Sequence, residues 1–158
     1  MNNYAFIDSQ NVNFTLRECG WRIDWRKFYI YLKEKHSVKC AYLFLGYLER
    51  NERFYQVLKK IGYKVIFKEI STVEGEIKGN IDAELVLQAM IDFKSYDKAV
   101  IVTSDGDFSC LVDYLYKNKK LQYVISPNFQ KCSLLLRRSA RNRVYGMGLL
   151  KGRLEYKK

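Results

Sequence analysis

A chain of 158 residues is long enough for one domain with its own hydrophobic core, and 48% of its residues are hydrophobic. With one proline and nine glycines, the composition differs from that of disordered or low-complexity chains. The formal net charge is +11 and only one histidine is present, which excludes Ser-His-Asp triads and other mechanisms that need several imidazoles. Any hydrolytic chemistry must therefore use carboxylates.

Short apolar runs alternate with segments of helical spacing along the whole chain. In chain order, the pattern predicts a strand at 4–7, a helix at 25–34, a strand at 38–47, a helix at 51–61, a strand at 64–67, a polar loop with Gly75 and Gly79, a helix at 81–93, a strand at 98–103, a helix at 108–117, a strand at 122–126, and a helix at 131–140 followed by irregular or strand-like structure. Short strands that are apolar on both faces are typical of a parallel sheet covered by helices on both sides. We therefore predict a single α/β domain spanning residues 1–158, with about five strands in a mainly parallel sheet.

The cysteines and the histidine do not suggest a zinc site. The four cysteines are widely spaced and form no CxxC pair; they are Cys19, Cys40, Cys110 and Cys132. We expect reduced thiols, three of them in the core. His36 is expected near the C-terminus of a helix, where a positive charge is favoured.

No apolar run is long enough to cross a membrane, and the chain runs from Met1 directly into a strand-like pattern without a signal peptide. We therefore expect a cytoplasmic protein with no membrane partner.

The positive charge is concentrated in residues 131–158, which contain nine Lys or Arg and one acidic residue, a net charge of +8. Such asymmetry is typical of proteins that bind an anionic partner, most often nucleic acid. A solvated, solubilising tail is the alternative. However, Arg137, Arg138, Arg141 and Arg143 are interleaved with leucine and valine, which a simple tail would not require.

Carboxylates follow two of the predicted strands at the point where each strand ends. Asp8 follows the first strand, and Asp105 and Asp107 follow the fourth. Asp82 lies at the start of the helix before that fourth strand. Because ligands bind at the carboxyl ends of strands in such sheets, we expect these acids to converge. Carboxylates that converge repel one another unless a cation lies among them, and hard oxygen ligands select Mg²⁺ or Mn²⁺.

Each acid also has a structural interpretation. Asp8 is equally suited to cap a following turn, and Asp105 and Asp107, in the sequence SDGD, have the residue types of a turn followed by a helix N-cap. The paired placement at strand ends favours the metal site.

Three stretches carry a family resemblance: FIDSQNVNF (6–14), KGNIDAELVLQAM (78–90) and TSDGDFSCLVDYL (103–115). In order and spacing they resemble the NYN family, a branch of the PIN-like nuclease superfamily, in its bacterial LabA-like group. The resemblance implies a Rossmann-like domain and a Mg²⁺ or Mn²⁺ site that acts on RNA. It also implies that the catalytic and metal-binding residues are Asp8, Asp82, Asp105 and Asp107.

The resemblance further implies that Asn11 is a polar partner at the first strand and that Lys78 contacts phosphate. Two positions depart from the family pattern. Ser104 replaces a glycine found in many relatives, and its hydroxyl could contact metal-bound water or phosphate. Gln88 stands where many relatives carry another acid, which leaves the number of metal ions open.

We therefore expect a metal-dependent endoribonuclease, in which the arginines of residues 137–143 and Lys78 bind substrate phosphates. The main alternative is a nucleic-acid-binding or regulatory NYN module with little or no catalysis. A carboxylate-metal phosphatase of the haloacid-dehalogenase type would need an acid at Gln10, and no glycine-rich nucleotide loop follows the first strand. A homodimer is possible, because the chain is rich in aromatic residues.

Overall fold

The computed structural model describes the backbone of residues 1–68, 71–73, 76–78 and 81–158, and the side chains of residues 1–68 and 81–158. At its centre lies a six-stranded sheet in which each pair of neighbouring strands is parallel. Its spatial order is β3 (Lys64–Lys68), β2 (Val38–Gly46), β1 (Asn3–Asp8), β6 (Ala99–Val102), β7 (Leu121–Ser126) and β8 (Val144–Gly146). A separate antiparallel hairpin pairs β4 (Ser71–Val73) with β5 (Glu76–Lys78). The predicted parallel α/β sheet is confirmed, with six strands instead of five.

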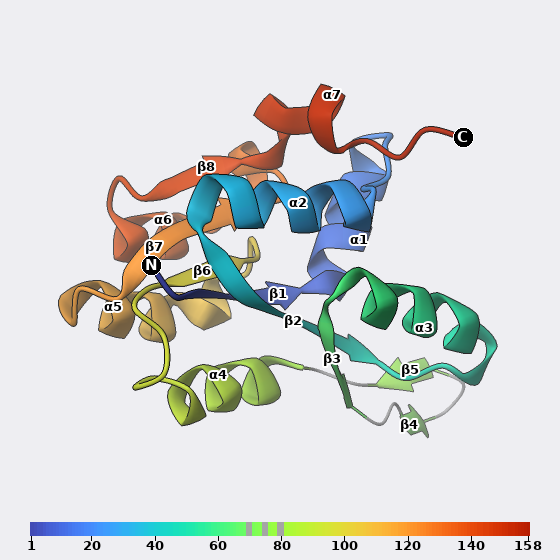
Figure 1. The fold of residues 1–158 in the computed structure, drawn as a ribbon, viewed down its shortest axis with the longest axis horizontal. Coiled ribbons are helices and arrows are strands. Elements are labelled where there is room, and N and C mark those ends of the chain that lie inside the picture. Colours follow the sequence, from blue (N-terminus) through green and yellow to red (C-terminus); the bar gives the residue numbers. More distant parts are fainter. Residues whose placement is uncertain (69–70, 74–75, 79–80) are drawn as a thin grey trace.

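The sheet separates two hydrophobic cores, because successive side chains of a strand point to opposite faces. In β1, Ala5 and Ile7 pack into one core and Phe6 into the other. Helices cover both faces, as predicted (Figure 1). The first core packs against α1 (Ser9–Glu18), α2 (Trp25–His36), α3 (Glu52–Ile61) and α7 (Lys151–Leu154). The second packs against α4 (Asp82–Ile91), α5 (Ser109–Lys117) and α6 (Leu134–Ala140).

The strand order reverses at β1. The chain builds β2 and β3 outward on one side of β1, then returns across the sheet and builds β6, β7 and β8 on the other side. Open parallel sheets have a crevice at the carboxyl ends of the strands where the order reverses, and ligands bind there. In this protein the crevice is expected between the ends of β1 and β6.

Helix α1 is an element that the sequence pattern did not predict. Its sequence contains two asparagines and a threonine, which have low helix propensity. Two tertiary features favour the helix nevertheless. The Asp8 carboxylate caps it by accepting a hydrogen bond from the backbone N–H of Asn11 (3.2 Å), and Val12 and Leu16 bury one face of the helix in the core.

His36 is the last residue of α2, as expected, but the expected positive charge there is wrong. The side chain is buried, and its Nε2 lies 2.6 Å from the hydroxyl of Tyr145. Burial, assisted by the charge of Lys35, lowers the pKa of His36 to about 4. The imidazole is therefore neutral at physiological pH.

The expectation of three core cysteines is also wrong: Cys132 is buried and Cys40 half-buried, whereas Cys19 and Cys110 are exposed. Residues 131–140 become helical only from Leu134, and β8 and α7 give the end of the chain regular structure. Within the described part of the chain, no helix has the length and apolar character needed to cross a membrane.

Candidate metal site at the carboxyl edge of the sheet

Four acids from three segments of the chain meet at the reversal point. Asp8 is the last residue of β1, and Asp82 is the first residue of α4. Asp105 lies three residues beyond the end of β6, and Asp107 lies in the 3₁₀ turn η2 (Gly106–Phe108) that leads into α5. Because β1 and β6 are neighbours in register, their carboxyl ends lie at the same edge of the sheet. The topology therefore brings these segments together, as predicted.

Asp82, Asp105 and Asp107 form a compact triad. Each offers one carboxylate oxygen, and these three oxygens all lie within 4.8 Å of one another. Asp82 and Asp105 are half-buried, whereas Asp107 is exposed, so the triad opens to solvent. Three carboxylate oxygens with room for water are the ligands that Mg²⁺ and Mn²⁺ prefer. The donor set therefore fits a divalent ion of this class.

Asp8 lies behind the triad and is not one of its members. Only 5% of its surface is exposed, and both of its oxygens accept hydrogen bonds, one from the backbone N–H of Asn11 and one from the hydroxyl of Thr103 (3.2 Å each). Burial raises the pKa of Asp8 to about 6 against the effect of these hydrogen bonds. The charges of Asp82 and Asp105 raise it further, which shows that Asp8 is electrostatically coupled to the triad.

A chain of hydrogen bonds holds the acidic loop against β1. The Thr103 hydroxyl donates to Asp8 and accepts from the backbone N–H of Asp105 (3.2 Å). The side-chain oxygen of Asn11 accepts from the backbone N–H of Ser104 (2.8 Å). Asn11, which the resemblance implied as a polar partner at the first strand, therefore positions the loop. Sequence reasoning did not identify Thr103, because a threonine at a strand end has no distinctive pattern.

Ser104 and Gly106 pack the same loop against the start of α6. The Ser104 hydroxyl is buried and lies 2.8 Å from that of Ser126, which favours a structural role over the suggested contact with phosphate. The backbone N–H of Ser133 donates to the carbonyl of Ser104 (3.1 Å). A β-carbon at Gly106 would lie 2.5 Å from the Ser133 hydroxyl oxygen, so this close approach requires glycine.

Gln88 and Asp92 lie farther along α4. The Gln88 amide donates to Asp92 (2.9 Å), and the hydroxyl of Tyr42 donates to the same carboxylate oxygen (2.6 Å). Asp92 is the C-cap residue of α4, whereas Asp82 begins the helix. Asp92 therefore does not replace the acid that Gln88 lacks. Among the described residues, the triad is the one group of three or more potential ligands that could hold a metal ion.

The suggested phosphate-binding residues are not gathered around the triad. Lys78 ends β5, but its side chain lies outside the described residues, as do Gly75 and Gly79. Arg137 lies over the ring of Phe129 (5.1 Å), and Arg138 is exposed. Arg141 and Arg143 lie at the opposite edge of the sheet, beside residues that precede β6 and begin β7. The basic segment is therefore divided between two edges of the sheet.

Comparisons with known proteins agree with this geometry. Residues 4–146 match the NYN domain family. The chain is 26% identical over 121 residues to the protein "Low amplitude and bright protein LabA" of Synechococcus elongatus, a match that covers 70% of this chain and 65% of that relative. It also resembles the crystal structure of a protein of unknown function from Vibrio parahaemolyticus, with a TM-score of 0.80, 24% identity and 92% of each chain covered. The latter likeness shows the fold.

Proposed function

Because the chain belongs to the NYN domain family, within the PIN-like nuclease superfamily, we propose that it is a metal-dependent ribonuclease that hydrolyses phosphodiester bonds. Family membership supports a nuclease-type function that involves nucleic acid. The observation that carries the proposal further is the triad of Asp82, Asp105 and Asp107, with oxygens within 4.8 Å of one another at the reversal point of the sheet.

In this proposal, Asp82, Asp105 and Asp107 hold a Mg²⁺ or Mn²⁺ ion. A bound ion of this kind lowers the pKa of a coordinated water and stabilises negative charge on phosphate oxygens. Asp8 supplies a fourth negative charge behind the triad and, through Thr103, fixes the loop that carries Asp105. A direct contact between Asp8 and the ion stays a prediction, because both Asp8 oxygens already accept hydrogen bonds.

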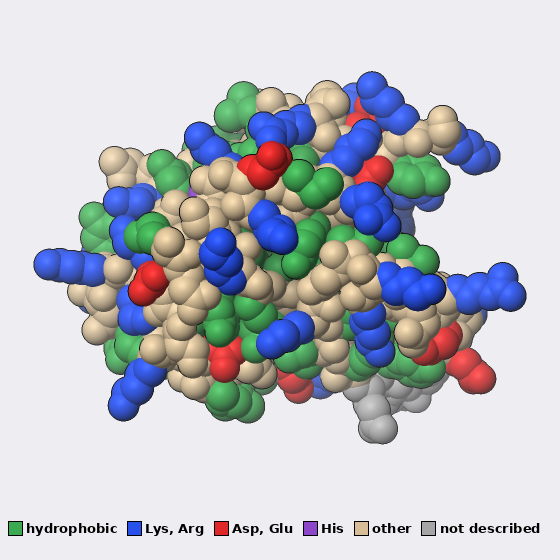
Figure 2. Space-filling view, viewed as in Figure 1, with side chains coloured by type: hydrophobic (Ala, Val, Ile, Leu, Met, Phe, Trp, Pro, Cys, Tyr) green, Lys and Arg blue, Asp and Glu red, His purple; other side chains and the backbone are tan. Residues whose placement is uncertain are grey.

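A hollow of about 800 Å³, lined by none of the three triad residues, is a candidate path for a single-stranded substrate. Its lining includes the exposed rings of Phe54 and Tyr156 and the basic Arg22, whereas Trp21 and Trp25 are each only 7% exposed. A smaller hollow shares part of this lining and reaches residues 9 and 10, directly after Asp8. Aromatic side chains stack on unpaired bases, and basic side chains attract the backbone. Figure 2 shows basic side chains spread over this face, with hydrophobic ones exposed between them.

A second candidate is an NYN module that binds nucleic acid without rapid catalysis. Gln88 favours it, because this amide replaces an acid that many relatives carry and is hydrogen bonded to Asp92. A single bound ion would then be the most that the described acids could support.

The deciding experiment measures cleavage of single-stranded RNA in Mn²⁺ by the wild type, by Asp105→Asn and by Glu34→Gln. Glu34 is an exposed acid on α2 that pairs with Arg153, so it is a charge-matched control. We expect Asp105→Asn to lose at least about 100-fold in rate while still binding RNA in EDTA, because one ligand and its charge are removed. Cleavage that survives EDTA or Asp105→Asn would refute the proposal. RNA binding without any metal-dependent cleavage would favour the non-catalytic module.

A further inference from the structure

A basic hollow of about 490 Å³ lies at the amino edge of the sheet, on the far side from the triad. Five of the seven residues that line it are cationic: Lys98, Lys117, Lys119, Arg141 and Arg143. Tyr116 and Leu121 complete the lining. Lys98 directly precedes β6, whereas Asp105 follows that strand. These two residues are seven positions apart along nearly extended chain, which corresponds to roughly 20 Å. The hollow is therefore separate from the triad.

The cations come from three separate segments, 98, 117–119 and 141–143, so sequence proximity alone does not explain the cluster. Lys98 precedes β6, Lys117 ends α5 and Lys119 follows it, Arg141 is the C-cap residue of α6, and Arg143 precedes β8. Asp97, which is next to Lys98, directs its carboxylate to the backbone N–H of Asn2 (2.7 Å). Like charges brought together by folding destabilise the protein unless an anion offsets them.

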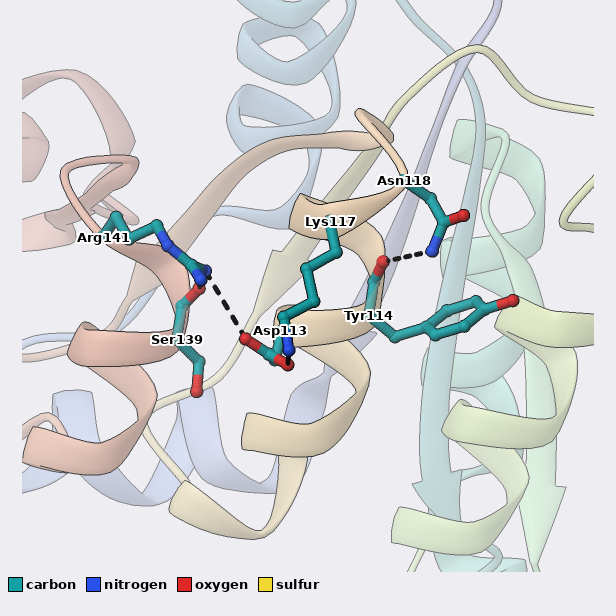
Figure 3. A network of polar contacts seen from close by, with 6 residues as sticks. All are labelled: Asp113, Tyr114, Lys117, Asn118, Ser139 and Arg141. Atoms are coloured by element: carbon teal, nitrogen blue, oxygen red, sulfur yellow. Dashed lines mark hydrogen bonds and ion pairs between the residues drawn. The ribbon is translucent and has the colours of Figure 1, made fainter.

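Local contacts position the two arginines. Arg141 lies over the ring of Tyr116 at 4.1 Å. It also donates to the backbone carbonyl of Ser139 and, together with Lys117, contacts Asp113 (Figure 3). The Asp113–Lys117 distance is 2.9 Å and the Asp113–Arg141 distance is 3.5 Å. Arg143 donates to the backbone carbonyl of Gln122 (3.3 Å). One carboxylate therefore holds two cations in place but balances only one of five charges.

The backbone is strained at the same place. Among the described residues, three non-glycine residues have positive φ, and two of them, Lys119 (60°) and Arg141 (57°), line this hollow. At Lys119 the positive φ is the ordinary end of helix α5, because the backbone N–H of Lys119 donates to the carbonyl of Tyr116 and that of Lys120 donates to the carbonyl of Leu115. Arg141, with a ψ of −120°, is not in that conformation, so the strained residue of the hollow is Arg141.

From these observations we propose that the hollow binds a ligand with at least two adjacent phosphate groups. Arginine matches phosphate through its planar pair of N–H groups, and lysine adds point charge. The volume lies in the range of small-ligand sites. The phosphates could belong to a free nucleoside polyphosphate or to an RNA chain, because both present the same chemistry. The proposal does not require the triad to be catalytic.

The test compares the wild type with Lys98→Gln/Arg143→Gln in EDTA. The matched control is Arg53→Gln/Lys60→Gln, which removes one arginine and one lysine from exposed positions on α3. The probes are pyrophosphate, ATP and a labelled single-stranded RNA. We expect the first variant to bind pyrophosphate or RNA at least tenfold more weakly than the wild type, and the control to stay within about twofold.

The probe that is affected identifies the source of the phosphates. Loss of ATP and pyrophosphate binding alone indicates a free nucleotide. Loss of RNA binding, with a salt-dependence slope smaller by about 1.4, indicates the RNA backbone. Equal losses in both double variants, or none in either, overturn the proposal. Because Arg143 also contacts the backbone of Gln122, Lys98→Gln/Lys119→Gln repeats the test with both arginines in place.

Discussion

The two edges of the sheet carry opposite charges, and Asp8 and Asp113 show the contrast best. At the carboxyl edge, burial raises the pKa of Asp8 to about 6. Near the amino edge, Asp113 is half-buried in the middle of α5, one turn before Lys117, and the hydrogen bond from Lys117 lowers its pKa, with Arg141 adding to the effect. The same side chain is therefore pushed toward its neutral form at one edge and toward its charged form near the other.

The parallel architecture contributes to this separation. Each strand–helix unit places a helix N-terminus at the carboxyl edge and a helix C-terminus at the amino edge, and the helix dipole favours acids at the first and bases at the second. Asp8 and Asp82 lie at the N-termini of α1 and α4, and Lys117 and Arg141 lie at the C-termini of α5 and α6.

The helix dipoles alone do not offset the electrostatic repulsion among the three carboxylates of the triad. A helix end contributes about 0.3–1 kcal/mol per favourable charge. Two carboxylates whose oxygens are 4.8 Å apart repel by about 3 kcal/mol at an effective dielectric constant of 20, and the triad contains three such pairs. The difference between these magnitudes is why we infer a divalent ion at the carboxyl edge.

The largest expected effect is therefore stabilisation by Mn²⁺. A ligand that binds only the folded state at a concentration 1,000 times its Kd adds about 4 kcal/mol to the free energy of unfolding. For a chain of this length, each kcal/mol raises Tm by about 2–4 °C. We expect thermal unfolding to show this rise in the wild type and in Asp113→Asn, but not in Asp105→Asn. An equal rise in all three proteins would place the ion elsewhere.

The next effect concerns the buried imidazole of His36. Its pKa falls from 6.5 to about 4 on folding, so between pH 6.5 and pH 4 the unfolded state binds more protons than the folded state. The stability that this group contributes is complete above pH 6.5 and is lost as pH falls toward 4. The loss is about 3 kcal/mol, from 1.36 kcal/mol per pKa unit. Urea unfolding at several pH values should show this dependence in the wild type and a smaller one in His36→Gln. A parallel profile in both would contradict the buried, neutral histidine.

The sequence predicted most of this arrangement, because strands and acids leave strong local signals. The five expected strands are present, and the segments with Asp8, Asp82 and Asp105 meet as proposed. Apolar runs such as residues 99–102 indicate strands that are buried on both faces, which is the pattern of a parallel sheet.

What the sequence did not predict depends on tertiary contacts. Helix α1 begins because Asp8 caps it and Leu16 is buried, although its asparagines favour turns. The role of Thr103 follows only from its position between Asp8 and Asp105, because its hydroxyl is hydrogen bonded to both residues. Arg141 is close in sequence to Arg137, yet helix α6 carries it away from the acidic loop to the other edge. The spacing of apolar residues along the sequence carries no information on these tertiary contacts.

A smaller effect is expected from Asp8→Asn, and its sign depends on pH and metal. The pKa of Asp8 is raised on folding, so the stability from this group is complete below pH 3.8 and is lost as pH rises through about 6. Asparagine keeps the helix cap without the buried charge. In EDTA at pH 8 we expect the variant to be more stable than the wild type by about 2 kcal/mol, less than the full pKa shift would give, because hydrogen bonds to the carboxylate are weakened.

This advantage of Asp8→Asn should disappear near pH 4, where the wild-type carboxyl is also neutral. It should shrink in Mn²⁺ at pH 8, because the ion favours the ionised carboxylate. Asp8→Ala is the control: it removes the cap as well as the charge, so it should be less stable than Asp8→Asn at each pH. A destabilised Asp8→Asn in EDTA at pH 8 would show that the hydrogen bonds from Asn11 and Thr103 outweigh the cost of burial.

The smallest effect is expected from Asp113→Asn, because exposed ion pairs contribute little to stability. The folded-state pKa of Asp113 is lowered, so its contribution is present at neutral pH and is lost as pH falls below its ordinary value of 3.8. We expect a slightly lower Tm at pH 7 that 1 M NaCl removes by screening. Binding of pyrophosphate should not weaken and should increase at low salt, because the basic hollow loses its one carboxylate. Weaker binding in Asp113→Asn would show instead that positioning of Arg141 by Asp113 matters more than the added charge.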